Sequence, residues 1–265
     1  MTLRRKTSAG ALALAAITML IGMPVQAAES EVLISQERAT AGGVTPGDEP
    51  GFPVTLSAPG RYRLTGNLVV PEGTDGIVIN ADNVTLDFGG YVLQGTMSAT
   101  GESDATGIAS YNDAIEIANG VITGFELFAI DSHTVGKYWT ISNMRIVSNG
   151  MGVSAGGYAR VVGNNISSNG NYGLSCQYCL VEGNVVALNR DDGIDVKAGT
   201  VLGNMIADNR GYGISAFMLA YVMTGYGNNT LINNNGAGRL GTDGHFIPQR
   251  PQVNGRIEAL QPNVE

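Results

Sequence analysis

Three lines of twenty residues make up the stretch from Val161 to Ala220: VVGNNISSNGNYGLSCQYCL, VEGNVVALNRDDGIDVKAGT and VLGNMIADNRGYGISAFMLA. Glycine, asparagine and aliphatic residues recur in the same columns of these lines. The aligned sets are Gly163, Gly183 and Gly203; Asn164, Asn184 and Asn204; Asn169, Asn189 and Asn209; Gly173, Gly193 and Gly213; and Leu174, Ile194 and Ile214. A fixed period of this length indicates a solenoid, in which each repeat packs mainly on its neighbours.

Short runs of strand-forming residues, separated by glycine and asparagine, fill each line. In one such run, Ile194 and Val196 share one face of a strand while Asp195 and Lys197 share the other. A leucine-rich repeat would show regularly spaced leucines, and a left-handed β-helix would show a hexapeptide period. We therefore predict that each line forms one coil of a parallel β-helix. An asparagine at the same turn of every coil can then bond its copies above and below, which predicts an asparagine ladder.

The pattern V-x-G-N-x-I-x-x-N-x-x-x-G-I resembles the right-handed parallel β-helix repeats of the pectin-lyase-like superfamily, in particular its secreted bacterial members. The clearest resemblance covers roughly residues 140–236, and a looser one begins near Arg61. It implies an all-β, right-handed parallel β-helix. It does not imply one activity, because that superfamily contains lyases, hydrolases, epimerases and proteins without a known reaction.

The pattern of the whole chain predicts four segments. Residues 1–27 have the basic, apolar and small-residue regions of a signal peptide. Residues 28–60, rich in proline and glycine, are expected to form an N-terminal arm and cap, with a helical turn near residues 35–39. Residues 61–236 are expected to form about eight coils, and residues 237–265 a short C-terminal cap or tail. The polar stretch 97–106 is expected to protrude as an insertion of unassigned role.

The last coil is irregular in sequence. The pair Gly227–Asn228 lies four residues later than the twenty-residue period requires. We expect this pair to take the place that Gly203 and Asn204 hold in the preceding line. The additional residues would then lie in the segment 217–224, between the last regular strand and this pair.

The charge composition of the chain excludes some classes of binding partner. The formal net charge is −8 over the whole chain, so no basic stripe is available to neutralise the phosphates of a nucleic acid. A signal peptide places the protein in the periplasm or outside the cell, with no membrane attachment after cleavage. The expected partner is therefore a polysaccharide or a cell-surface glycan. The sequence predicts no oligomeric state.

The densest polar cluster lies at residues 189–197, and coil stacking enlarges it. Asp192, for example, lies between Tyr172 and Tyr212 of the neighbouring coils. Aromatic faces and charged groups are the side chains that bind sugars, which predicts a shallow binding groove on one outer sheet. This role for Asp192 requires that its turn rotates the side chain outward. The predicted binding residues are Tyr172, Arg190, Asp192, Asp195, Lys197, Arg210 and Tyr212.

The same cluster contains candidate catalytic groups. Glycoside hydrolysis requires two carboxylates, which Asp191, Asp192 and Asp195 could supply. A polysaccharide lyase would instead need acidic residues that hold Ca²⁺ beside a base such as Lys197. The structural alternative is that Asp and Asn fill the turns between coils, because they tolerate a left-handed backbone and bond locally.

The Asp-rich run also resembles the Asp-bearing coils of polygalacturonases, but the later motifs of those enzymes are incomplete. Their Gly-His-Gly motif corresponds to Gly244–Phe246, in which phenylalanine takes the third place. Their Arg-Ile-Lys motif corresponds to Arg256–Glu258, in which glutamate replaces the lysine. We therefore favour binding over catalysis and predict no cofactor or metal, with Ca²⁺ needed only if the protein is a lyase.

Cys176 and Cys179 form a Cys-Gln-Tyr-Cys motif. A disulfide is the simplest expectation in a secreted protein. Free thiols remain an alternative, because Cys176 aligns with inward positions and Cys179 with a turn position. Metal or redox chemistry is the third. For the protein as a whole, the sequence thus leaves three hypotheses: a polysaccharide-binding β-helix, a polyuronate lyase or hydrolase, and a structural or adhesive rod without a small ligand.

Overall fold

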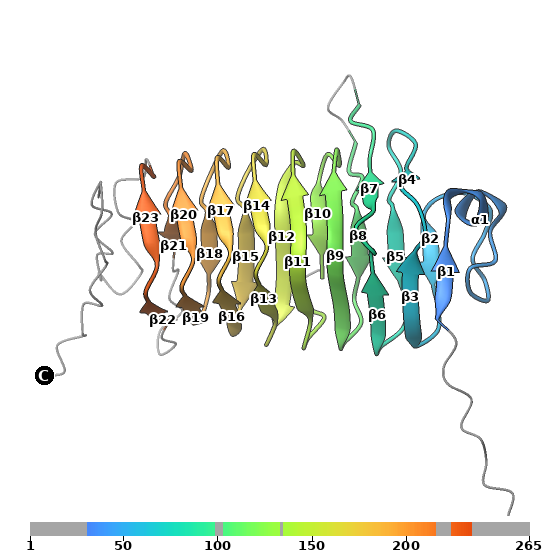
Figure 1. The fold of residues 1–265 in the computed structure, drawn as a ribbon, viewed down its shortest axis with the longest axis horizontal. Coiled ribbons are helices and arrows are strands. Elements are labelled where there is room, and N and C mark those ends of the chain that lie inside the picture. The colour runs from blue at the N-terminus through green and yellow to red at the C-terminus, as the bar shows by residue number, and fades with distance from the viewer. Residues whose placement is uncertain (1–30, 99–102, 133–134, 216–223, 235–265) are drawn as a thin grey trace, which may run out of the picture.

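Two long parallel sheets wind around one axis, so that the chain forms an all-β, right-handed parallel β-helix with almost no helix (Figure 1). The computed structural model describes residues 31–98, 103–132, 135–215 and 224–234. The predicted signal peptide and C-terminal tail, 1–27 and 237–265, lie outside the described residues.

The smaller sheet contributes one strand to each coil, and its strands pair in parallel in chain order. Its eight strands agree with the predicted number of coils. They are β2 (Val54–Leu56), β5 (Ile77–Ile79), β8 (Ile108–Ser110), β10 (Phe128–Asp131), β12 (Met151–Gly157), β15 (Leu174–Gln177), β18 (Ile194–Val196) and β21 (Ile214–Ser215).

The larger, fifteen-stranded sheet follows two paths along the same axis. The main path consists of β1 (Val32–Ile34), β3 (Gly60–Leu64), β6 (Val84–Asp87), β9 (Ile115–Thr123), β11 (Thr140–Val147), β13 (Arg160–Val162), β16 (Cys179–Glu182), β19 (Gly199–Leu202) and β22 (Thr224–Gly227). The second path passes through the long strands β9 and β11 and otherwise consists of β4 (Leu68–Val69), β7 (Val92–Gln94), β14 (Asn165–Ser167), β17 (Val185–Ala187), β20 (Met205–Ala207) and β23 (Thr230–Ile232).

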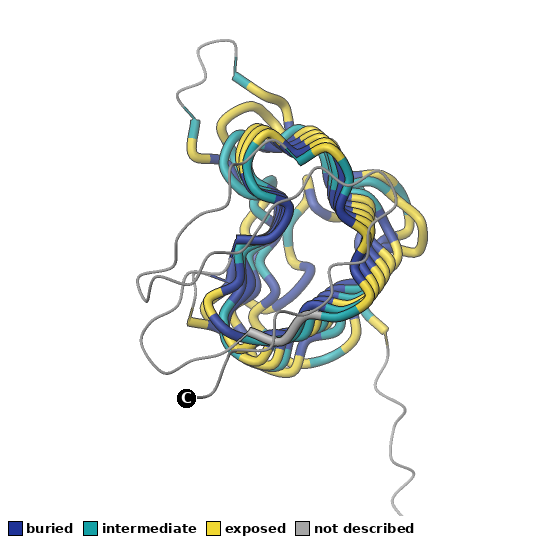
Figure 2. The backbone as a smooth tube through the Cα atoms, turned by 90° about the vertical axis from the view of Figure 1, so that its left-hand side faces the viewer, coloured by how far each residue is buried: buried dark blue, intermediate teal, exposed yellow. Residues whose placement is uncertain are grey.

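Alternation along the strands separates the core from the surface. Ile194 and Val196 are fully buried, whereas Asp195 between them is half-exposed, as the sequence predicts. Seen along the axis, the coils superimpose and buried positions line their inner side (Figure 2). Aliphatic residues of successive coils thus form one continuous core, and their burial contributes roughly 25 cal/mol for each Å² of apolar surface.

Two asparagine ladders run along the turns and confirm the predicted stacking. Asn184 Nδ2 donates to Asn204 Oδ1 at 2.9 Å and to the Val161 carbonyl at 2.8 Å. The first ladder contains Asn164, Asn184, Asn204 and Asn229. The second contains Asn149, Asn169, Asn189, Asn209 and Asn234.

Close packing between coils explains one of the glycine columns. A Cβ atom at Gly193 would lie 2.8 Å from Asn209 Nδ2 and 2.8 Å from the Gly213 carbonyl oxygen. Any larger residue would therefore displace the ladder or the next coil. The repeat carries glycine here because the backbones approach closely, not because the turn needs flexibility.

A short helix, α1 (Gln36–Ala41), lies at the N-terminal end of the stack (Figure 1). The Ser35 hydroxyl caps it by accepting a hydrogen bond from the Arg38 N–H at 3.2 Å, so the helical turn expected near residues 35–39 is present. Strand β1 pairs with β3, and β2 pairs with β5. Sheet pairing therefore begins before Arg61, where the sequence places the first coil.

The predicted alignment of the last coil is wrong by one residue. Asn204 N–H donates to Asn229 Oδ1, so the ladder continues at Asn229 and not at Asn228. Asn228 instead has a φ of 51°, which matches the φ of 61° at Gly203. Asparagine tolerates this left-handed conformation, so Asn228 replaces the turn glycine and its successor enters the ladder.

The insertion at 97–106 connects β7 to β8, and the structure describes its residues 97–98 and 103–106. Thr106 N–H donates to Asp75 Oδ1 of the preceding coil at 2.7 Å, which fixes the end of the insertion. Beyond it the parallel register continues, with Val84 paired to Ile115. The insertion lengthens one coil without breaking the core.

Candidate functional site

The outer surface of the smaller sheet carries a column of polar residues, which we call the polar face. Parallel pairing sets these residues side by side, one from each of five successive coils. Their order along the axis is Asp131, Ser154, Ser175, Asp195 and Ser215. Ser175 and Asp195 at its centre are half-exposed, whereas the remaining three are buried.

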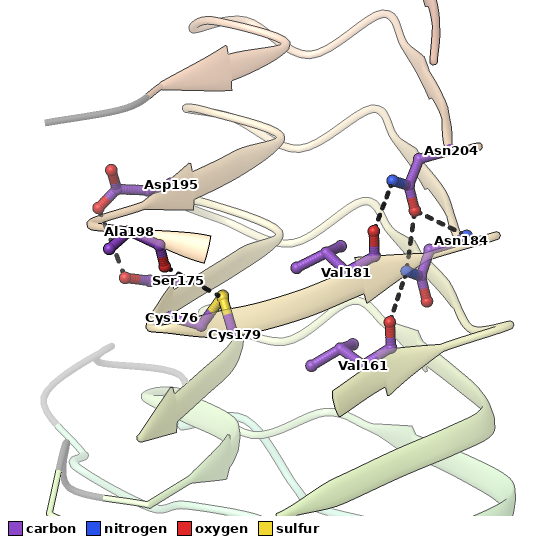
Figure 3. Close-up of a disulfide and its surroundings, with 9 residues drawn as sticks. All are labelled: Val161, Ser175, Cys176, Cys179, Val181, Asn184, Asp195, Ala198 and Asn204. Atoms are coloured by element: carbon purple, nitrogen blue, oxygen red, sulfur yellow. Dashed lines mark hydrogen bonds between the residues drawn. A yellow bond between two sulfur atoms is a disulfide. The ribbon is translucent and has the colours of Figure 1, made fainter. Parts of the chain in front are cut away.

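Ser175 and Asp195 make the direct contact at the centre of this face. The Ser175 hydroxyl donates to Asp195 Oδ2 at 3.4 Å, and Figure 3 shows this pair beside the disulfide and far from the asparagine ladder. The bond is long, so it holds the carboxylate only weakly. Asp195 is half-exposed as a residue, whereas its Oδ1 atom is buried, so a ligand would reach the carboxylate through Oδ2.

Tyr172 lies close to the polar face. Burial raises the pKa of its hydroxyl, and the negative charges of Asp131 and Asp195 raise that pKa further. Its ring lies 6.5 Å from that of Phe128, tilted by 48°. Tyr172 thus presents a neutral hydroxyl near two carboxylates throughout the physiological pH range.

Asp192 is held inside its turn. Its side chain is only 8% exposed, and Oδ1 accepts a hydrogen bond from the Tyr212 N–H at 2.6 Å. Burial raises the pKa of this carboxyl; the bond from Tyr212 lowers it, and the neighbouring charges of Asp191 and Asp195 raise it. Because Oδ1 is engaged by the backbone of the next coil, Asp192 supports the turn and is poorly placed as a first contact for a ligand.

The cationic members of the predicted groove are exposed. Arg190 and Arg210 occupy equivalent turns, where their backbone N–H groups donate to the ladder residues Asn169 at 3.0 Å and Asn189 at 2.9 Å. Lys197 directly follows β18. Asp195 therefore interacts electrostatically with both Tyr172 and Asp192, and the three cations are exposed.

Cys176 and Cys179 are joined by a disulfide, which is the first of the three outcomes expected from the sequence. Both residues are buried. The bond spans Gln177, the last residue of β15, and Tyr178, which forms the turn between β15 and β16. It fixes the corner at which the polar face ends.

Within the residues that the structure describes, no three His, Cys, Asp or Glu side chains are grouped in a way that could hold a metal ion. No helix in this part of the chain is long and apolar enough to cross a membrane. The incomplete polygalacturonase-like motifs at 244–246 and 256–258 lie outside the described residues.

Sequence reasoning missed three exposed tyrosines at the corner between the two sheets. Tyr138, Tyr158 and Tyr178 are spaced by one repeat, and that spacing was the available signal. They align one above another in the structure, with neighbouring ring centroids 5.6 and 5.7 Å apart. Their column runs along the edge of the polar face.

These features define a class of protein: a parallel β-solenoid with asparagine ladders, a polar outer face and a column of exposed aromatic rings. No family model, no curated protein and no solved structure matches the chain. The site must therefore be interpreted from its own chemistry.

Proposed function

We propose that this protein is an exported β-helix that binds polysaccharide on its polar face without cleaving it, and that it belongs to the pectin-lyase-like superfamily. The observation that carries the proposal is the register that aligns Ser175 and Asp195 beside Tyr172 on one outer face. Stacked coils repeat such groups about every 4.8 Å along the axis. A linear polymer presents hydroxyl groups with a comparable regularity, so one chain can contact Ser175 and Asp195, the two half-exposed members of the face, on adjacent coils.

The charges around the polar face suit hydroxyl-rich and acidic sugars. Asp195 can accept hydrogen bonds from hydroxyl groups, and Lys197, Arg190 and Arg210 can donate to hydroxyl or carboxylate oxygens. The whole chain has a net charge of −8, so these exposed cations are local exceptions on an acidic protein. We assign direct contacts to Asp195 and the three cations, and a supporting role to Asp192.

Two features support export to the periplasm or the cell exterior. The disulfide between Cys176 and Cys179 is of a kind that persists in oxidising compartments. The pattern of residues 1–27 is typical of a secretory signal. Polysaccharides of the cell surface are available in those compartments, which agrees with the proposed partner.

Titration calorimetry with soluble neutral, carboxylated and sulfated polysaccharides tests the proposal. Lys197→Ala and Arg190→Ala should each weaken binding by about tenfold, because hydrogen bonds from charged groups contribute about 1.5–3 kcal/mol. Glu182→Ala, an exposed change on the larger sheet, is the matched control and should leave the affinity unchanged. A folded protein that binds none of these polymers would overturn the proposal in favour of a structural rod.

Glycan cleavage is the second candidate, and one observation favours it. The raised pKa of Asp192 is the property that a general acid needs, and Asp195 lies close enough to influence that pKa; the proton would have to be delivered from Oδ2, because Oδ1 accepts the bond from the Tyr212 N–H. Asp192→Asn separates the two functions. In an enzyme it should abolish turnover of a polyuronate, whereas in a binding protein the parent shows no turnover and the variant keeps its affinity.

A further inference from the structure

The column of tyrosines has an unusual backbone. Tyr138, Tyr158 and Tyr178 have φ values of 60°, 60° and 53°, in the left-handed region. Their side chains are 60%, 54% and 43% exposed. The left-handed region costs a bulky L-residue conformational energy, and Ala114 and Leu188 share it at other turns, so the turns of the coils impose this backbone.

The turn itself does not require tyrosine. Asn83 occupies the corresponding corner of an earlier coil with a φ of 58°, and asparagine adopts this conformation more readily. Burial in the core does not explain the choice either, because all three rings face solvent. The rings therefore need another explanation, either in their mutual stacking or in a ligand.

The stack ends abruptly at Tyr178. The ring planes of Tyr138 and Tyr158 are inclined by 16°, and those of Tyr158 and Tyr178 by 19°. In the next coil the same position is Ala198, because Cys179 pairs with Gly199. Ala198 carries no ring, so the column of stacked rings ends at Tyr178 and the next coil places no fourth ring over it.

A shallow pocket of about 510 Å³ opens at this point. Tyr158 and Tyr178 contribute aromatic walls, and the main charged group in its lining is Arg160. Its remaining lining residues are Ala159, Cys179, Leu180, Ala198, Gly199 and Thr200. The volume is in the range of sites that bind small molecules, and the lining combines apolar surface with one cation.

The backbone around the pocket is held in place by two constraints. The disulfide from Cys176 to Cys179 brackets Tyr178, and Cys179 itself lines the pocket. A Cβ atom at Gly199 would lie 2.3 Å from the Cys179 carbonyl oxygen, so only glycine allows these two coils to approach so closely. The ring of Tyr178 is therefore presented from a fixed turn, which lowers the entropic cost of binding.

We propose that this pocket is a sugar-binding subsite in which one ring of a glycan lies against Tyr178 above Ala198 and continues the column of stacked tyrosines. Aromatic side chains bind the apolar face of a sugar ring, and Arg160 donates to the oxygen atoms at its edge. The proposal rests on the proposed function, because Gln177 and Lys197 at the end of the polar face directly precede Tyr178 and Ala198 in their coils. A glycan on the polar face would reach this corner.

Replacement of Tyr178 by asparagine provides the sharpest test. Tyr178→Asn removes the ring but keeps a residue that favours the left-handed backbone, so the fold should survive with an unchanged or higher melting temperature. Binding of linear oligosaccharides, measured by titration calorimetry on the whole protein, should weaken about tenfold. Tyr178→Phe retains the ring and should keep most of the affinity. Full affinity in Tyr178→Asn would overturn the subsite.

Tyr138→Asn is the matched control, because Tyr138 occupies an equivalent turn two coils away and does not line the pocket. It should leave the affinity unchanged. An equal loss of affinity in both variants, or an equal fall in melting temperature, would show that the column serves only the stability of the coil and would overturn the proposal.

The oligosaccharide series separates the subsite from the polar face and defines the sugar. One series should be neutral, one carboxylated and one sulfated, with Arg160→Gln expected to reduce binding of the acidic series most. Binding that depends on Lys197 but not on Tyr178 overturns the subsite and leaves the proposed function standing. Binding that depends on Tyr178 but not on Lys197 or Arg190 supports the subsite and overturns the polar face as the site.

Discussion

Asn204 Oδ1 accepts two hydrogen bonds from Asn184, one from its backbone N–H at 2.8 Å and one from its side-chain Nδ2 at 2.9 Å. Asn184 repeats both bonds as an acceptor toward Asn164. Asn184 thus bonds to the turns of both neighbouring coils, the preceding one through Asn164 and the following one through Asn204. This reciprocity explains why asparagine recurs at a position that is almost completely buried.

Asn184→Ala should therefore destabilise the protein. The change removes the bonds that Asn184 makes to the Val161 carbonyl and the Asn164 N–H in a buried turn, at a cost of about 1–3 kcal/mol for each buried group left unsatisfied, while Asn164 Nδ2 keeps its bond to the Ile141 carbonyl. Urea denaturation gives the free energy of unfolding. Glu182→Ala, an exposed change in the adjoining strand, is the control, and an equal stability of the two variants would contradict the importance of the ladder.

Ile194→Asp should be far more harmful than Asp195→Ala. Ile194 is fully buried, so aspartate there would carry an unpaired carboxylate into the core at a cost of several kcal/mol. Asp195 is half-exposed and the bond that it accepts from Ser175 is long, so its removal should cost little. Thermal denaturation of both variants provides the comparison, and similar losses would mean that the two faces of β18 are misassigned.

Leu188→Asn should stabilise the fold. Leu188 is 58% exposed and has a φ of 59°, so it contributes little burial and adopts a conformation that costs an L-residue roughly 1–2 kcal/mol. Asparagine reduces this cost, and we expect a gain of about 1 kcal/mol in the free energy of unfolding. Val185→Asn, on the adjoining strand without a positive φ, should give no gain. A less stable Leu188→Asn variant would argue against strain at this corner.

Asp192 should make the free energy of unfolding depend on pH, with its contribution to stability lost as the pH rises. Its pKa is raised in the folded protein, chiefly by burial, so the ionised form is disfavoured in the folded state. The protonated group therefore supports folding below the ordinary value of 3.8, and this contribution is lost as the pH rises through the raised pKa.

Asp192→Asn keeps an oxygen for the Tyr212 N–H and removes the charge. The variant should be more stable than the parent at neutral pH, and the difference should shrink at a pH below 3.8. Asp191→Asn, an exposed change in the same turn, should show a smaller effect. Urea denaturation at both pH values measures the difference, and a parent that is the more stable of the two at neutral pH would contradict the inferred cost of the charge.

The repeat determined the fold because, in a β-helix, residues that are one sequence period apart lie side by side in adjacent coils. Twenty residues return the chain to the same corner, so Asn184 had to meet Asn164 and Asn204, and Ile194 had to meet Leu174 and Ile214. Alternation within each strand then fixed which residues entered the core. Where the period fails, in the coil that contains Asn229, the sequence placed the ladder one residue too early.

Only the tertiary structure decided the details of the site. The period placed Asp192 and Tyr172 in one column, but the rotation of each turn decided that Asp192 bonds to the Tyr212 N–H while Tyr172 lies near two carboxylates. Likewise, the spacing of Tyr158 and Tyr178 was visible in the sequence, whereas their exposure and stacking depend on a left-handed backbone at the corner. A period specifies which residues are neighbours, but backbone dihedral angles and contacts between coils set the direction of each side chain.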